Sequence, residues 1–289
     1  MPSLRVIMVI IFSRSKRNKA PHHSTMTKTG TNALPALSNQ PRPTPFTYNP
    51  AMAKKLDLER ILHRQGFGTR KMCRILIVNE EVTVNGVMCD DPDATFELDN
   101  LHFTVQGEAW QYQEHSYLMM YKPAHYECTH KTQFHPTIYT LLPAPLVERG
   151  IQCIGRLDED TTGLILLSDD GQFIHKISSP KHHVPKVYEV DCKHALSDGQ
   201  LQSLLSGVQL VDEDQIIAAL EVTRISDNVI HMTLAEGKYH QVKRMIAAIG
   251  NRVENLKRIR IGQLVLPEDL QPGEWRWLSG QALAALQQA

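Results

Sequence analysis

The sequence predicts an α+β protein with two unequal folded units, the larger built on a mixed, largely antiparallel sheet flanked by helices. Segments with strand patterns outnumber helical segments, and the two kinds do not alternate regularly. This order argues against a doubly wound parallel sheet. A chain of 289 residues is long enough for one large domain or two unequal ones. Its 42% hydrophobic and 21% charged residues are ordinary for a globular protein.

Residues 1–53 differ from the rest of the chain and are expected to be a disordered extension. The first 51 residues hold seven of the sixteen prolines and show no lasting periodicity. The apolar run near the start is too short to span a bilayer, and basic residues follow it instead of a secretory cleavage site. An acid-free leader also resembles an organelle transit peptide. Our preferred hypothesis is that natural translation starts at Met52.

The pattern of apolar and turn residues over 54–100 predicts a small basic unit of two short helices and a hairpin. Leu56, Ile61 and Leu62 fit one helical face, and the glycines of Gly66-Phe67-Gly68 end that helix. Thr69 is a candidate N-cap for the second helix. Four apolar positions are expected on that second helix: Met72, Ile75, Leu76 and Ile77. Strand, tight turn and strand follow at Val82–Val84, Asn85-Gly86 and Val87.

Residues 101–115 are polar and predict a linker to the larger unit, residues 116–289. Alternating or continuous apolar runs in that unit predict strands near residues 116–122, 151–154, 164–167, 186–190 and 229–234. Helical patterns are expected near residues 138–142, 197–206 and 238–249.

The charges are unevenly distributed, although the formal net charge is zero. Residues 54–79 hold seven basic residues against two acidic ones, and residues 238–260 hold seven against one. Two local basic surfaces are typical of a protein that binds a polyanion such as RNA. Solvated helix faces would give the same pattern.

The cysteines and histidines give no sign of a metal centre. The five cysteines contain no CxxC pair, which is easiest to explain by free thiols in a reducing cytoplasm. His182-His183 lacks partner ligands at helical spacing, so no metal is expected.

The segment GRLDEDTTGLILLSDDG, residues 155–171, is the strongest candidate for chemistry. An aspartate is already ionised at neutral pH, so Asp158 needs no activating histidine to act as a nucleophile or base. Three reactions remain open on the residues alone. They are a magnesium-dependent phosphatase with a DxDxT loop, a glycosidase with paired carboxylates, and a reaction at a nucleoside glycosidic bond, which the basic unit favours.

Two resemblances to known families narrow these alternatives. The segment KLDLERILHRQGFGTRKMCRILIVNEEVTVNG resembles the S4-type RNA-binding domain. The segment GRLDEDTTGLILLSDDG, followed by SSPKHHVPKVYEV and EGKYHQVKRMIAAIGN, resembles the RsuA group of pseudouridine synthases. This resemblance covers the chain from about Lys54 to the C-terminus.

The resemblance implies a role for individual residues. Asp158 would be the catalytic aspartate that attacks the target nucleoside, Tyr188 the ring that stacks on the base, and Lys243 the partner of the aspartate. Arg156 would help to hold the RNA. The other expected RNA-binding residues are Arg64, Arg70, Lys71, Arg74, Lys238 and Arg244. No cofactor is implied.

The resemblance also implies a substrate and a setting. The expected activity is isomerisation of one uridine in 16S rRNA, the family target uridine 516, by a cytoplasmic monomer that acts on this RNA or on the assembling small subunit. Two alternatives stay open: a sister enzyme that acts on 23S rRNA, and a non-catalytic rRNA-binding assembly factor.

Overall fold

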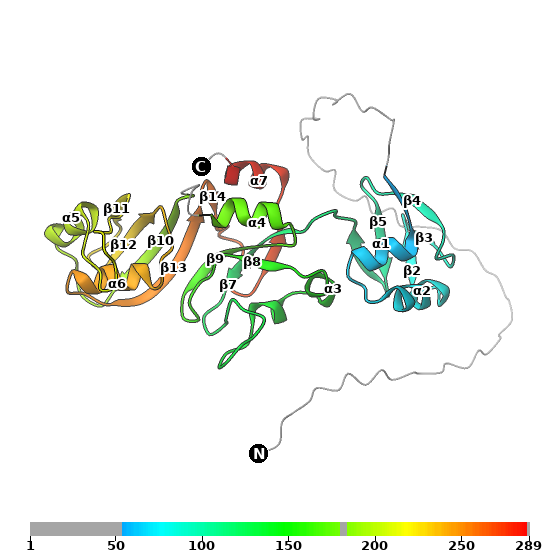
Figure 1. The fold of residues 1–289 in the computed structure, drawn as a ribbon, viewed down its shortest axis with the longest axis horizontal. Helices are drawn as coiled ribbons and strands as arrows, with labels where there is room; N and C mark the ends of the chain where they lie inside the picture. Colours follow the sequence, from blue (N-terminus) through cyan, green and yellow to red (C-terminus); the bar gives the residue numbers. More distant parts are fainter. Residues whose placement is uncertain (1–53, 180–183, 288–289) are drawn as a thin grey trace, which may run out of the picture. The chain divides into compact units, whose positions relative to one another are not determined.

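The computed structural model describes residues 54–179 and 184–287 (Figure 1). The predicted extension and the His182-His183 pair therefore lie outside the described residues. The fold is α+β with a mixed sheet, as predicted. No helix among the described residues is long and apolar enough to cross a membrane.

The first part of the described chain is a small unit with its own core. Its elements are β1 (Lys55–Asp57), α1 (Leu58–Arg64), α2 (Arg70–Val78), β2 (Val82–Val84), β3 (Val87–Met88), β4 (Thr95–Glu97), β5 (His102–Val105) and β6 (Glu108–Gln111). Four of the strands form an antiparallel sheet in the order β3-β2-β5-β6, and β1 pairs with β4. The helices pack on this sheet through buried residues that include Leu58, Ile61 and Phe103.

Helix α2 begins at its predicted cap, but its apolar face differs from the prediction. The side chain of Thr69 accepts a hydrogen bond from the backbone N–H of Met72, which starts α2. Met72 and Ile75 are 54% and 49% exposed, whereas Cys73 and Ile77 are fully buried. Cys73 and Ile77 are four residues apart, so a short helix with one covered side buries this pair, while Leu76 is partly buried and Met72 and Ile75 face solvent.

The predicted linker over residues 101–115 is wrong, because β5 and β6 lie within it. Phe103 and Val105 alternate with polar residues and are buried in the core of the small unit. Gln106 and Gly107 join the two strands with φ angles of 53° and 86°, the positive values of a tight hairpin turn. β5 lies inside the sheet and alternates polar with buried apolar residues, and β6 at the edge has no buried residue, so the polar composition concealed both strands.

The larger unit is built on one mixed sheet. Its strands are β7 (Tyr117–Lys122), β8 (Gln152–Ile154), β9 (Thr162–Ser168), β10 (Lys186–Cys192), β11 (Glu221–Arg224), β12 (Val229–Leu234), β13 (Val253–Ile261), β14 (Leu264–Val265) and β15 (Trp275–Trp277). The main path runs β11-β12-β10-β13-β9-β7-β15, with β14 on β13 and β8 on β9. Only β9 and β13 pair in parallel among these strands.

The helices of the larger unit are the 3₁₀ helix η1 (Ile138–Leu141), α3 (Ala144–Glu148), α4 (Gly171–Ser178), α5 (Asp198–Ser206), α6 (Gln241–Ala248) and α7 (Gly280–Gln287). The predicted helix at 197–206 is confirmed, with Ser197 as a capping-box residue. The predicted helix at 238–249 starts later, at Gln241. Helix α4 was missed, because Asp169-Asp170-Gly171 has the composition of a turn.

Strand β9 lies between β13 and β7 in the larger sheet and is buried on both faces. Ile165 and Leu167 face one apolar cluster, while Leu164 and Leu166 face another. This two-residue alternation explains why the segment is continuously apolar in sequence. The loop that enters β9 is thereby fixed to the best-packed element of the fold.

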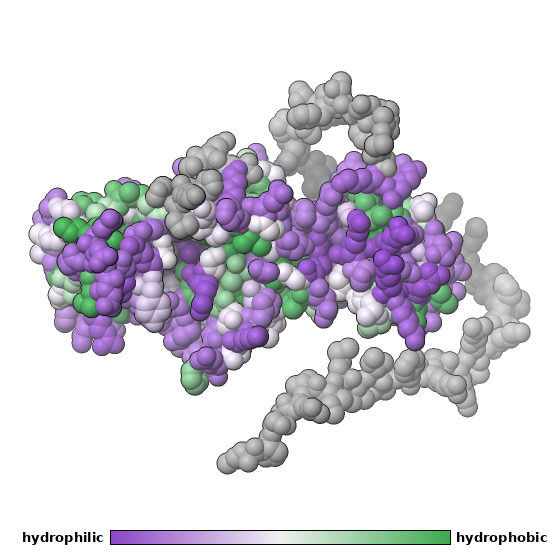
Figure 2. All heavy atoms as spheres, in the orientation of Figure 1, coloured by the Kyte–Doolittle hydropathy of each residue, from purple (hydrophilic) through white to green (hydrophobic). Residues whose placement is uncertain are grey.

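The surface view shows mostly hydrophilic residues, with apolar side chains reaching the surface near α5 and β11 (Figure 2). The exposed apolar residues of this region include Leu205, Ile216 and Leu220.

Candidate active site

Asp158 lies on the loop between β8 and β9, and two glycines shape this loop. Gly155 and Gly163 have φ angles of 72° and 103°, which favour glycine. Gly163 is also pressed against the backbone of Arg258, where an added Cβ would lie 2.2 Å from the carbonyl oxygen. The parallel pairing of β9 with β13 therefore requires a glycine at this position.

Lys122 also holds this loop in place through hydrogen bonds. Its side chain is completely buried, and Nζ donates to the carbonyl oxygens of Pro123, Glu159 and Thr161 at 2.9, 2.9 and 2.8 Å. Burial lowers the pKa of Lys122, and nearby acidic groups oppose that shift. Two of the three acceptors belong to the loop that follows Asp158, so the ammonium group fixes the loop backbone.

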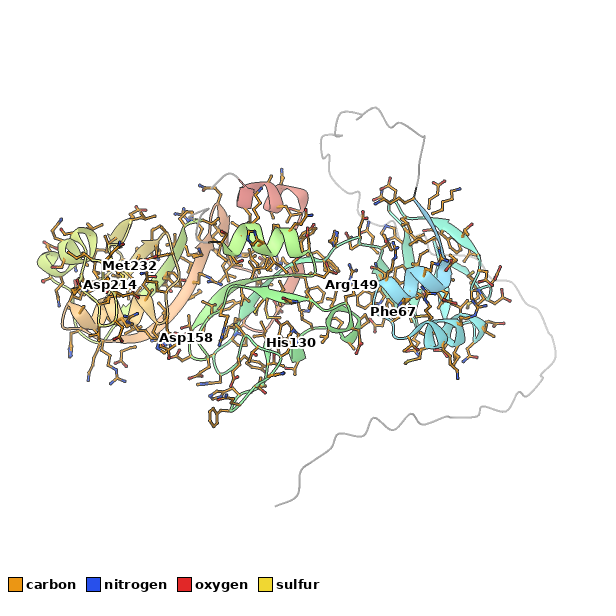
Figure 3. The ribbon with its side chains drawn as sticks, viewed as in Figure 1. Phe67, His130, Arg149, Asp158, Asp214 and Met232 are labelled. Carbon is orange, nitrogen blue, oxygen red and sulfur yellow. The ribbon has the colours of Figure 1, made fainter. Side chains whose placement is uncertain are left out.

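Asp158, labelled in Figure 3, is contacted by two basic side chains from the start of α6. Lys243 Nζ lies 3.1 Å from Oδ2, and His240 Nε2 lies 3.3 Å from Oδ1. The Asp158 side chain is 30% exposed, so an incoming molecule can reach it. A partly exposed carboxylate between two basic groups is held in one orientation.

Lys243 also contacts a second carboxylate, that of Asp160. Its Nζ donates to Asp160 Oδ1 at 2.6 Å and to Oδ2 at 2.9 Å. Burial alone would lower the pKa of Lys243, but Asp160 and Asp158 outweigh it and the pKa lies above its ordinary value. Burial would raise the pKa of Asp160, yet Lys243 holds it below the usual range.

Tyr188 lines the same pocket as Asp158 and Lys243, together with Arg156 and His240. It lies on β10, and only 7% of its surface is exposed. The structure therefore brings the three predicted catalytic residues together around one hollow. Arg156 is exposed and has no carboxylate within ion-pair distance among the described residues.

A second pocket of about 150 Å³ adjoins the first and shares Tyr188 and Arg156 with it. Lys186 and Arg258 also line it. Arg258 is 3% exposed; its Nε donates to Leu164 O at 2.8 Å, while Nη2 has no partner among the described residues. Burial, and then the charge of Arg258, lower the pKa of Lys186. One acid, Glu236, also lines this pocket, so the three basic side chains leave an excess of positive charge that favours an anion.

Two predicted RNA-binding residues beside the pocket are paired with an acid. Lys238 Nζ lies 2.6 Å from Glu213 Oε2, and Arg244 Nη1 lies 3.3 Å from Glu213 Oε1. Arg244 also donates to the carbonyl oxygens of Tyr239 and Val211. Both side chains thus tie the loop around Glu213 to the start of α6.

The predicted RNA-binding residues of the small unit fall into two groups. Arg74 contacts Glu59 at 2.7 Å and Asp93 at 3.2 Å, and Arg70 lies 3.9 Å from Glu59. Arg64 and Lys71 are exposed, and the described residues place no carboxylate within ion-pair distance of either. Arg64 and Lys71 are therefore more available to a polyanion than Arg70 and Arg74 are.

Sequence reasoning missed Lys122, Asp160 and His240. His240 is adjacent to Gln241 in the motif that contains Lys243, so its place in that motif was the available signal. One possible metal-binding group also went unnoticed, because its members are distant in sequence: His125, His135 and Glu159, whose ligand atoms all lie within 4.8 Å of one another.

The comparisons with known proteins agree with this geometry. Residues 116–248 match the RNA pseudouridylate synthase family. The chain is 46% identical over 165 residues to "Ribosomal small subunit pseudouridine synthase A" of Vibrio parahaemolyticus, covering 56% of this chain and 70% of that protein. The protein of the same name from Salmonella typhimurium is 37% identical over 231 residues, covering 79% of this chain and 99% of its own.

A solved structure described as a pseudouridylate synthase aligns with a TM-score of 0.57 and 33% identity, covering 80% of this chain and 99% of its own. The chain therefore belongs to the RNA pseudouridylate synthase family, in the group of the ribosomal small subunit pseudouridine synthases A, the RsuA type.

Proposed function

We propose that this enzyme isomerises one uridine of small-subunit rRNA to pseudouridine, with Asp158 as the nucleophile. The observation that carries the proposal is the carboxylate of Asp158 in a pocket lined by Tyr188, with Lys243 3.1 Å away. An ionised carboxylate is nucleophilic without a separate base. Its relatives named as small-subunit pseudouridine synthases supply the substrate class.

The reaction conserves every atom of the substrate. In this proposal Asp158 attacks the target nucleoside, and the bond between the ribose C1′ and the uracil N1 breaks. The uracil rotates within the pocket, and C1′ bonds to C5 as the bond to Asp158 breaks. C5 then loses its proton, and N1, which carries no proton in uridine, gains one. Lys243 and His240 hold the carboxylate in position throughout.

Tyr188 is proposed to hold the base during rotation. A target uridine must leave its stack before it can reach Asp158, which costs a few kcal/mol. Stacking on an aromatic ring returns about 1–3 kcal/mol per base. The ring of Tyr188 is fixed within the larger core, and it borders both pockets. It is thus suited to receive a flipped base.

The RNA backbone is proposed to lie along the second pocket. Phosphates are the natural partners of Arg156, Lys186 and Arg258, because the described residues place no acid on these side chains. Lys238 and Arg244 would contribute only when RNA displaces Glu213 from them.

The small unit is proposed to act as an S4-type RNA-binding domain that positions the rRNA. Its supporting features are two exposed basic residues, Arg64 and Lys71, on two short helices beside a hairpin. Arg70 and Arg74 add positive charge on the second helix, although their acidic partners reduce its effect. We further propose uridine 516 of 16S rRNA as the target, and a cytoplasmic monomer that needs no cofactor as the active form.

Pseudouridine mapping tests this function. Cells that lack the gene are rescued with wild type, with Asp158→Asn, or with an empty vector, and 16S and 23S rRNA are mapped by carbodiimide treatment and reverse-transcription stops. In cells that lack the gene, we expect one 16S stop to be absent. Only rescue with wild type should restore that stop.

The other outcomes separate the alternatives. A 23S stop that depends on Asp158 would keep the mechanism and change the target. No stop in either RNA, with a defect in subunit assembly, would support the assembly-factor hypothesis. Restoration by Asp158→Asn would refute the role of Asp158.

A further inference from the structure

We propose that His125, His135 and Glu159 form a zinc-binding site on the rim of the active-site loop, separate from the residues that carry the isomerisation. His125 Nδ1 lies 3.2 Å from Glu159 Oε2, and His135 Nε2 lies 3.7 Å from the same oxygen. All three ligand atoms lie within 4.8 Å of one another. The site rests on this arrangement and not on the proposed function.

The spacing suits a tetrahedral ion. Zinc binds histidine nitrogen and carboxylate oxygen at about 2.0–2.2 Å, which places the atoms of neighbouring ligands about 3.3–3.6 Å apart. The distances from Glu159 Oε2 to the nitrogens of His125 and His135, 3.2 and 3.7 Å, lie just below and just above this range. Two histidines and one glutamate are a known ligand set of zinc sites in which water takes the fourth position. The side chains of His125, His135 and Glu159 are 75%, 36% and 40% exposed, so the fourth position is open to solvent.

His125 is held in the left-handed backbone conformation, which is uncommon for residues other than glycine. Its φ angle is 64°, in the left-handed region where a side chain carries a steric cost. Its backbone N–H donates to Glu159 O at 2.7 Å, which fixes it directly against a second ligand residue. A glycine would be the unstrained residue here, so the histidine side chain is the part of this residue that needs an explanation.

The other two ligands are held by contacts independent of a metal. The Glu159 carbonyl also accepts from the buried ammonium of Lys122 at 2.9 Å. Glu127 accepts backbone N–H bonds from residues 133–135 at 3.3, 3.2 and 3.1 Å, and these bonds hold its pKa below the usual value. Glu127 thereby fixes the loop that presents His135. A site whose ligands are already positioned binds metal at a smaller entropic cost.

The test is a zinc titration of the full chain, stripped of metal with a chelator, against a chromophoric competitor for the ion. We expect one site that weakens by at least about tenfold in His125→Gly and in His135→Ala, the loss typical when even a supporting group of a metal site is removed. His125→Gly suits the positive φ angle, so this variant should remain folded. His102→Ala, an exposed histidine on β5, is the matched control and should bind as wild type does.

Cobalt provides a second measurement that identifies the ligands. The visible spectrum of the cobalt-loaded protein should lack the strong thiolate-to-metal band, because no cysteine belongs to the site. Equal affinity in wild type, His125→Gly and His135→Ala would overturn the proposal, and so would a thiolate band. Activity is a separate readout. We expect His125→Gly to isomerise uridine, since the ion lies outside the group around Asp158, so zinc binding and the proposed reaction can fail independently.

Discussion

The ammonium group of Lys243 lies 3.1 Å from the carboxylate of Asp158, inside the pocket that Tyr188 lines. Removing this charge should reduce the rate of the chemical step. We expect Lys243→Met to lower single-turnover isomerisation of a 16S rRNA substrate by about 100-fold or more, the usual cost of losing one stabilising group at a reacting centre. Lys243→Arg keeps the charge and should lose less. Equal rates in wild type and Lys243→Met would contradict the pairing.

The contact between Lys243 and Asp160 predicts a pH dependence of stability. The pKa of Asp160 is lowered in the folded state, so its contribution is present above the ordinary value of 3.8 and is lost as the pH falls through the folded value. Urea unfolding between pH 6 and pH 3 should therefore show a shallower acid decline for Asp160→Asn than for wild type. Parallel curves would mean that the ion pair adds nothing to stability.

Lys122 offers a test of how the catalytic loop is held. Lys122→Met removes the donor of three buried carbonyl groups. Glu159 O keeps the backbone N–H of His125, so two carbonyl groups lose their donor. Each unpaired group costs about 1–3 kcal/mol, so the free energy of unfolding should fall by about 2 kcal/mol or more. Chemical denaturation measures this loss. Among molecules that remain folded, the single-turnover rate should fall more than RNA binding, because the backbone beside Asp158 is no longer fixed. A stable and fully active variant would refute the role.

How far the sequence could predict this protein depends on whether a feature is local. Continuous apolar runs and caps such as Thr69 and Ser197 act within a few residues, so the central strands and several helices were predicted correctly. Asp170 caps α4 by accepting from Gln172 N and Phe173 N. The segment Asp169-Asp170-Gly171 also has the composition of a turn, so the local pattern could not distinguish the start of a helix from a turn.

The candidate site shows the same limit. The motifs named Asp158, Tyr188 and Lys243, and these residues do line one pocket. The contacts of Lys122 and Asp160 arise because β7, β9 and α6 meet in space, and no spacing along the chain encodes that meeting. Pairing of a basic residue with an acid is equally non-local, which is why Lys238 and Arg244 could not be recognised as partners of Glu213.

Two glycines beside Asp158 allow a matched comparison. Gly163→Ala places a Cβ 2.2 Å from Arg258 O, whereas Gly155→Ala meets nothing within 4 Å. Both have positive φ angles, so each alanine carries a conformational cost of about 1–2 kcal/mol. Gly163→Ala should lose clearly more, because β9 and β13 must separate. Thermal unfolding of both variants measures the difference, and equal losses would mean that the strands adjust freely.

The second pocket predicts a salt-dependent effect on RNA binding. If Lys186 contacts a phosphate, Lys186→Met should weaken binding to all RNA sequences by a similar factor. It should also reduce the slope of log affinity against log salt by about 0.7–0.9, the contribution of one released counterion. Lys193→Met removes an exposed lysine just beyond the same strand and is the matched control. Filter binding at several salt concentrations measures both slopes. An unchanged slope for Lys186→Met, or an equal change in Lys193→Met, would place the phosphates elsewhere. A changed slope in Lys186→Met alone would mean that the RNA backbone crosses this pocket beside Tyr188, within reach of the group that carries the reaction.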